Sequence, residues 1–157
     1  MPAAEWVMDW SGLTVGVTGG AGFIGSHLVV SLVDCCATAV VLDNFSSGKA
    51  DQVPSSVRPV SGSVADSTVR SEALSGCDAI FHIAAIASVV ACEEDPEKSA
   101  SVNREASLSI LAEASCPVVF ASSAAIYGNP QQLPVSESHP IEPLSHYGAD
   151  KAAADAA

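Results

Sequence analysis

Two residues near the end of the chain have the types and spacing of an acid–base pair. Tyr147 and Lys151 are four positions apart, so on a helix their side chains share one face. An ammonium group beside a phenol stabilises the phenolate, which suits the phenol to proton transfer. The alternative is an ordinary pair on an exposed helix, where a Tyr and a Lys can have the same spacing without any catalytic role. Ser123 favours catalysis, because it stands at the end of a predicted strand, where α/β sheets bind ligands.

A glycine-rich segment near the start of the chain has the spacing of a dinucleotide-binding turn. Gly19, Gly22 and Gly25 follow a β-branched segment and open an apolar one. The first glycine allows a tight turn, the second admits a pyrophosphate near the backbone, and the third lets the helix approach the strand. Bound phosphate would face the helix N-terminus. A purely structural turn is the alternative, but the strand–turn–helix context favours a nucleotide.

Asp43 has the position of a ribose-binding carboxylate. It follows the apolar residues 39–42, roughly 20 residues beyond the glycines, where a carboxylate can accept hydrogen bonds from the adenosine ribose. Its negative charge would repel a 2′-phosphate. The sequence therefore favours NAD over NADP, with a solvated aspartate at the strand end as the alternative.

Alternating strands and helices must position these groups. The patterns predict strands at 13–18, 39–42, 57–60, 78–82 and 117–121, and helices from the glycine turn to 33, at 66–74, at 96–115 and from 145 onward. This alternation predicts an α/β, Rossmann-type parallel sheet with helices on both faces and the strand order 3-2-1-4-5. We expect residues 1–12 to form an N-terminal extension and 13–157 one NAD-binding domain.

The composition excludes several classes of protein. The 157 residues suit one domain, and 48% hydrophobic with 5% aromatic residues indicates an aliphatic core. A net charge of −12 argues against nucleic-acid partners. No apolar run approaches the roughly 18 residues of a membrane span, and the first ten residues lack Lys and Arg, so we expect a cytoplasmic protein and no membrane partner.

The five cysteines do not form a recognisable metal or redox pattern. Their number is odd, none forms a C-x-x-C pair, and none lies at a metal-ligand spacing from a histidine. We expect small buried thiols in a reducing compartment and no metal site.

Taken together, seven motifs resemble those of the extended short-chain dehydrogenase/reductases, the NAD-dependent epimerase/dehydratase family. The closest subgroup in this resemblance is the UDP-glucose 4-epimerases. The motifs cover the chain from Leu13 to Asp155, and their joint order is far more specific than any one of them. They are Thr18–Gly25, Asp43-Asn44, Phe81–Ala85, Asp95-Pro96, Val102-Asn103, Ala121–Gly128 and Tyr147–Lys151.

The resemblance implies roles for residues in six of these motifs. Ser123 would hydrogen-bond the reacting sugar hydroxyl, Tyr147 would take its proton, and Lys151 would hold the nicotinamide ribose. NAD would accept a hydride and return it to the other face of a 4-keto sugar, and the same resemblance implies that this sugar is carried on UDP. The implied cofactor contacts are Gly19, Gly22, Phe23, Ile24, Gly25, Asp43, Asn44, Ser47, Gly48, Ser63, Val64, Ala84, Ala85, Asn103, Tyr147 and Lys151.

Departures from the family pattern narrow the reaction. Ala124 and Ala125 stand where the sugar-nucleotide 4,6-dehydratases have an Asp-Glu pair, so elimination of water lacks its acid and epimerisation is favoured. Ser63 stands where family members usually have an Asp near the adenine, and Ala91 lies near a position where many of them have an Arg. His146 replaces a frequent Pro; we interpret it as an exposed loop residue.

Length is the largest departure. Family members continue beyond the Tyr-Lys helix with further strands and a smaller domain that holds the nucleotide sugar, so we expect most of the substrate region to be absent here. A non-catalytic NAD-binding module is therefore an alternative function. An NADP-dependent reductase of the same superfamily is another, against which Asp43 argues. Family dimers pair through the helices predicted at 96–115 and after 145, so a homodimer is possible.

Overall fold

Five parallel strands form the centre of the protein. The computed structural model describes residues 8–157. Its strands are β1 (Thr14–Thr18), β2 (Thr38–Asp43), β3 (Arg58–Ser61), β4 (Ala79–His82) and β5 (Val118–Phe120). Their order is β3-β2-β1-β4-β5, all parallel, which confirms the predicted Rossmann-type sheet. The strand order reverses between β1 and β4, where sheets of this kind bind ligands.

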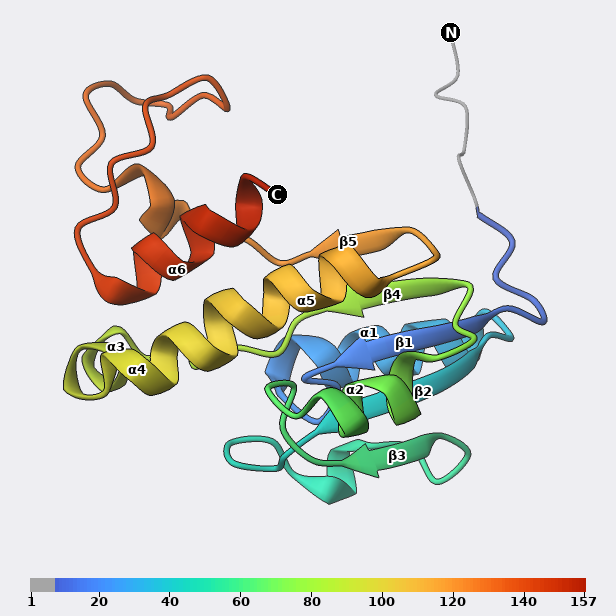
Figure 1. Ribbon diagram of the computed structural model, residues 1–157. Helices are drawn as coiled ribbons and strands as arrows, with labels where there is room; N and C mark the ends of the chain where they lie inside the picture. Colours follow the sequence, from blue (N-terminus) through green and yellow to red (C-terminus); the bar gives the residue numbers. More distant parts are fainter. Residues whose placement is uncertain (1–7) are drawn as a thin grey trace, which may run out of the picture.

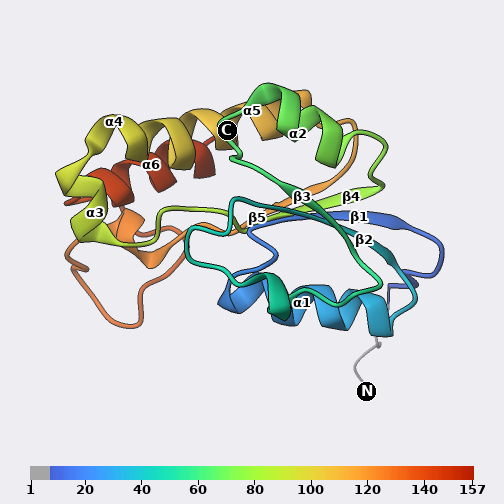
Figure 2. The same cartoon turned by 90° about the horizontal axis from the view of Figure 1, so that it is seen from below.

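Helices cover both faces of the sheet. They are α1 (Phe23–Asp34), α2 (Ser67–Leu74), α3 (Val89–Glu94), α4 (Pro96–Ser99), the π-helical η2 (Ala100–Glu105), α5 (Ala106–Glu113) and α6 (His146–Asp155), with short 3₁₀ turns η1 (Ala50–Gln52) and η3 (Ala124–Tyr127). Helix α1 lies on one face, and α2 and α5 lie on the other (Figure 2). Helices α3, α4 and α6 lie beyond the ends toward which the strands point (Figure 1).

The inner strands β1, β2 and β4 are apolar on both sides because both of their faces are covered. Val15, Val17 and Val41 point toward α1, where they pack with Val29. Alternate residues such as Leu42 point to the opposite face and pack with α2 and α5. Period-two alternation of apolar and polar residues is therefore absent, and the uninterrupted apolar runs in the sequence have a direct structural cause.

The prediction of one continuous helix at 96–115 is wrong. The structure divides it into α4, η2 and α5 and ends it at Glu113. The Ser107 hydroxyl of α5 donates to the carbonyl of Asn103 in the π-helical part at 2.8 Å, and such side-chain bonds compensate backbone groups where helical pairing changes. The sequence prediction also missed α3, whose six residues are too few for a periodic signal; its N-cap is Ser88, which accepts from the Ala91 N–H at 3.2 Å.

The prediction that the cysteines are buried is wrong for two of them. Cys35 and Cys36 are exposed, whereas Cys77 and Cys92 are buried and Cys116 is half-buried. The exposed pair ends α1, and Cys36 takes a left-handed φ of 63° where the chain turns back toward β2. Among residues 8–157, no three His, Cys, Asp or Glu side chains are grouped as metal ligands would be.

The end of the predicted N-terminal extension packs on the domain. The Trp10 ring lies 5.9 Å from the Phe81 ring, centroid to centroid, and contacts the core on the α1 side. Residues 1–7 of that extension lie outside the described part of the chain. Within the described part, no helix combines the length and apolarity needed to cross a membrane.

Candidate functional site

The glycine-rich turn joins β1 to α1 with little space for side chains. Gly19 has a φ of +70°, and a Cβ there would lie 2.8 Å from the Ala84 backbone. A Cβ on Gly25 would overlap the Gly19 carbonyl oxygen. Gly22, the N-cap of α1, is less crowded, since its nearest atom would be the Gly19 oxygen at 3.3 Å. Gly19 and Gly25 thus shape the turn, and Gly22 leaves its outer surface open.

Asp43 connects the end of β2 to this turn. One carboxylate oxygen accepts from the Ala21 N–H at 2.9 Å, and the other accepts from the Phe45 N–H at 2.8 Å. The residue is 8% exposed, so the alternative of a solvated strand-end aspartate is wrong. Each carboxylate oxygen has a second lone pair, and these can still accept hydroxyl donors.

A cavity of about 680 Å³ opens between the glycine turn, the carboxyl ends of β2 and β4, and helices α3 and α4. Phe23 and Ile24 are 81% and 64% exposed at its edge and give the cavity an apolar rim. Twelve of the predicted cofactor contacts line it: Gly19, Gly22, Phe23, Ile24, Gly25, Asp43, Asn44, Ser47, Ser63, Val64, Ala84 and Ala85.

Two predicted contacts lie behind the cavity wall instead. Asn103 is fully buried; its side chain accepts from the Ile86 N–H at 2.8 Å and donates to the Ile86 carbonyl at 3.1 Å. Gly48 packs against the glycine turn, where a Cβ would lie 2.6 Å from the Ala21 backbone. The sequence prediction did not assign to the cofactor site the part of the lining that comes from α3, α4 and Asp95 between them, which includes Ala91, Glu94 and Lys98.

Lys151 is held at the end of β5. The residue is only 2% exposed, its Nζ donates to the Ala121 carbonyl at 2.9 Å, and it lies 4.5 Å from the centroid of the Phe120 ring. Burial lowers the pKa of the Lys151 ammonium to about 8. An ammonium fixed in this way is a preorganised positive charge beside the rim of the sheet.

Ser123 and Tyr147 come from the two segments that meet there. The Ser123 hydroxyl oxygen accepts from the Ala125 N–H at 3.2 Å and so opens η3, which leaves its own O–H free to donate. Half-buried Tyr147 lies in the first turn of α6. A Cβ on neighbouring Gly148 would be 2.8 Å from the Ala125 carbonyl oxygen, so α6 and η3 are in close contact. None of the three predicted catalytic residues lines the cavity itself.

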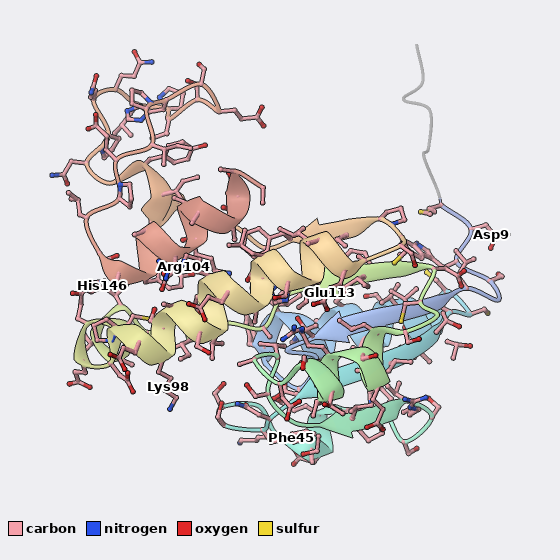
Figure 3. The ribbon with its side chains drawn as sticks, viewed as in Figure 1. Asp9, Phe45, Lys98, Arg104, Glu113 and His146 are labelled. Carbon is pink, nitrogen blue, oxygen red and sulfur yellow. The ribbon has the colours of Figure 1, made fainter. Side chains whose placement is uncertain are left out.

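The first residue of α6 also attaches that helix to α3. The His146 N–H donates to a Glu93 carboxylate oxygen at 2.7 Å, and its ring nitrogen lies 3.8 Å from the other one. His146 is therefore exposed as predicted, but it begins a helix and does not lie in a loop (Figure 3).

A buried chain of polar side chains runs behind the cavity from β1. The side-chain oxygen of Thr18, Oγ1, accepts hydrogen bonds from the Ile83 and Ala84 N–H groups. Its single O–H must therefore donate to His82 Nδ1, 2.6 Å away. The proton of the neutral imidazole then lies on Nε2, which donates to Ser107 at 2.8 Å. Both ring nitrogens of His82 are thus engaged in buried hydrogen bonds, which makes it a structural residue.

His82 makes the protein sensitive to acid. Burial, with smaller contributions from the Lys151 and Arg70 charges, lowers the His82 pKa from 6.5 to about 3. Below pH 6.5 the unfolded chain binds a proton that the folded chain does not, so stability falls as the pH decreases toward 3. Between pH 7 and pH 4, we expect the unfolding free energy of the His82→Gln variant to fall by about 3 kcal/mol less than that of the parent. Urea unfolding at both pH values measures the unfolding free energies of the two proteins. An equal decrease in both would contradict the assignment of His82 as a buried neutral imidazole.

Comparison with known proteins places this geometry in a family. The model of the NAD dependent epimerase/dehydratase family matches residues 15–157. The chain belongs to this family. It is 34% identical over 143 residues to the UDP-glucose 4-epimerase of Azospirillum brasilense and 36% identical over 145 residues to that of Corynebacterium glutamicum, covering 86% and 88% of this chain. It spans only 40% and 44% of those two relatives, less than half their length.

Solved structures of epimerases have the same fold. The UDP-glucose 4-epimerase of Thermus thermophilus in complex with NAD superposes with a TM-score of 0.85 at 37% identity, and that of Thermotoga maritima with UDP-glucose superposes with 0.87 at 33%. Each comparison covers 92% of this chain and 49% of the other. This member of the epimerase/dehydratase family thus corresponds to about half of those enzymes.

Proposed function

We propose that this chain binds NAD in the 680 Å³ cavity and acts on a nucleotide sugar, most directly as a UDP-glucose 4-epimerase. The observation that carries the proposal is the contact between η3 and α6 at the end of β5, which brings together the segments of Ser123, Tyr147 and Lys151. The related epimerases with NAD and with UDP-glucose support the choice of cofactor and substrate.

The cavity has features that fit NAD. The α1 N-terminus and the open surface at Gly22 suit a pyrophosphate. Asp43 retains lone pairs for ribose hydroxyls and would oppose a 2′-phosphate, while Val64 offers an apolar contact for the adenine. Bound NAD would supply a hydride acceptor, and donor, for C4 of the sugar.

The chain's own residues would handle the proton and the charge. Ser123 has a free O–H to orient the C4 hydroxyl, and Tyr147 would take its proton as the C4 hydrogen leaves. Lys151 would stabilise the resulting phenolate through its fixed positive charge. Ala124 and Ala125 provide no carboxylic acid to expel water from the sugar, which favours epimerisation over dehydration.

Incubation with UDP-galactose and either NAD or NADP tests the proposal. We expect UDP-glucose to form with NAD and at least about tenfold more slowly with NADP, because Asp43 disfavours the extra phosphate. A preference for NADP would overturn the cofactor assignment. A second candidate is a non-catalytic NAD-binding module, favoured by the fact that Ser123, Tyr147 and Lys151 do not line the cavity. Tight NAD binding without sugar conversion would support that candidate.

A further inference from the structure

Asp150 is a buried carboxylate with no part in the chemistry proposed above. It precedes Lys151 on α6 and is 4% exposed. Burying a carboxylate is costly unless hydrogen bonds or opposite charges compensate it. Its contacts therefore indicate what it contributes.

Two side chains from the neighbouring helical segments compensate Asp150. The Ser99 hydroxyl, fully buried at the end of α4, donates to Asp150 Oδ2 at 2.6 Å. Arg104 of η2 approaches the other oxygen to 3.8 Å from a half-exposed position. Figure 3 shows Arg104 where α6 passes the long helical segment. The short, buried Ser99 bond fixes Asp150 more tightly than the long ion pair does.

The Ser99 hydroxyl also connects Asp150 to the cavity wall. Asn103 Nδ2 lies 3.4 Å from Ser99 Oγ, and the same amide group holds both backbone polar groups of Ile86. Ile86 lines the cavity. Three buried side chains therefore join helix α6 to the wall of the proposed cofactor site.

We propose that Asp150 is a positioning residue, whose hydrogen bond to Ser99 sets the rotation of α6 that brings Lys151 onto the Phe120 ring and the Ala121 carbonyl. Adjacent helical residues point about 100° apart, so fixing one side chain against α4 directs the next toward β5. The inference rests on the proposed role of Lys151. The charged groups around this part of α6 are Arg104 from η2, Glu93 from α3 and the ammonium of Lys151 itself.

Lysine side-chain NMR on the 157-residue chain tests the proposal without turnover, so its failure is distinguishable from failure of the epimerase assignment. The chain has only three lysines, Lys49, Lys98 and Lys151, so Lys151→Met assigns the signal. A side chain over the Phe120 ring gives an upfield ring-current shift, and its buried ammonium titrates at about pH 8.

Four variants separate position from charge. Ser99→Ala keeps the carboxylate but removes the hydroxyl that donates to it, and Asp150→Ala removes the carboxylate and with it the hydrogen bond. In each we expect the upfield shift to disappear and the titration of Lys151 to move up by about one pKa unit or more, as the ammonium regains water. Asp150→Asn removes the charge but keeps a partner for Ser99, so the shift should remain. Asp155→Asn, on the exposed end of α6, is the control and should behave like the parent.

Two results would overturn the proposal. One is retention of the ring-current shift in both Ser99→Ala and Asp150→Ala, which would show that α6 keeps its rotation without the bond. The other is loss of the shift in Asp150→Asn to the same extent as in Asp150→Ala, which would assign the effect to the negative charge. Circular dichroism of each variant verifies that the helices are intact. If Asp150→Ala does not fold, the ring-current shift in Ser99→Ala, the smallest change, is the test.

Discussion

Tyr147→Phe is expected to lower the turnover of sugar nucleotide by a factor of about 10²–10⁴, the usual contribution of a positioned acid–base group. The substitution removes only the phenolic oxygen, so helix α6 and its contact with η3 should persist. KM should change little, since the proton is transferred only in the reaction itself. Initial rates measured by product chromatography give both parameters.

Tyr127→Phe is the matched control, because Tyr127 is the only other tyrosine. Its ring packs edge-on against His139, with centroids 5.6 Å apart, and that contact does not need the hydroxyl. We expect turnover near the parent value. Equal losses in the two variants would remove the specific role assigned to Tyr147.

Gly25→Ala is expected to weaken NAD binding by about 100-fold or more, close to 3 kcal/mol. The new methyl group would overlap the Gly19 carbonyl oxygen and crowd the Gly20 Cα at 2.8 Å. Both neighbours are backbone atoms, so the turn or the start of α1 must move. Because the cavity lies directly outside this turn, the displacement reaches the proposed phosphate site. Calorimetric titration with NAD measures the dissociation constant.

A glycine at the opposite end of the sheet separates local strain from the binding effect. Gly76 has a φ of +75° with no atom within 4 Å of an added Cβ, so Gly76→Ala strains the backbone by about 1 kcal/mol without a clash. It should lower stability and leave NAD affinity unchanged. A folded Gly25→Ala protein with the parent's affinity would contradict the role of this turn.

Local sequence patterns were sufficient to predict the sheet and the glycine turn, and the family resemblance added most of the other residues that line the proposed cofactor cavity. Uninterrupted apolar runs marked the strands, and the order of strands and helices then fixed the sheet topology. Gly19, Gly22, Gly25 and Asp43 were recognisable because their roles depend on fixed distances along the chain from one strand. The structure places all four at the cavity.

The parts that the sequence did not predict depend on contacts between distant residues. Thr18 and His82 are 64 positions apart, and Ser99 and Asp150 are 51 apart. Spacing along one helix or strand carries no information about such pairs. Asn103 was expected to contact the cofactor, but the π-helical segment directs its amide to Ile86 behind the wall. The exposure of Cys35 and Cys36 likewise follows from the chain reversal after α1.

The fate of the sugar's C4 hydrogen tests the central claim most directly. UDP-galactose carrying deuterium at C4 is incubated with the protein and NAD, and the UDP-glucose formed is examined by mass spectrometry. A hydrogen moved as a hydride does not exchange with water, so the account predicts full retention of deuterium at C4 in the product. Product in which solvent hydrogen has replaced the deuterium would show epimerisation by proton abstraction and would contradict the mechanism proposed for Ser123, Tyr147 and Lys151.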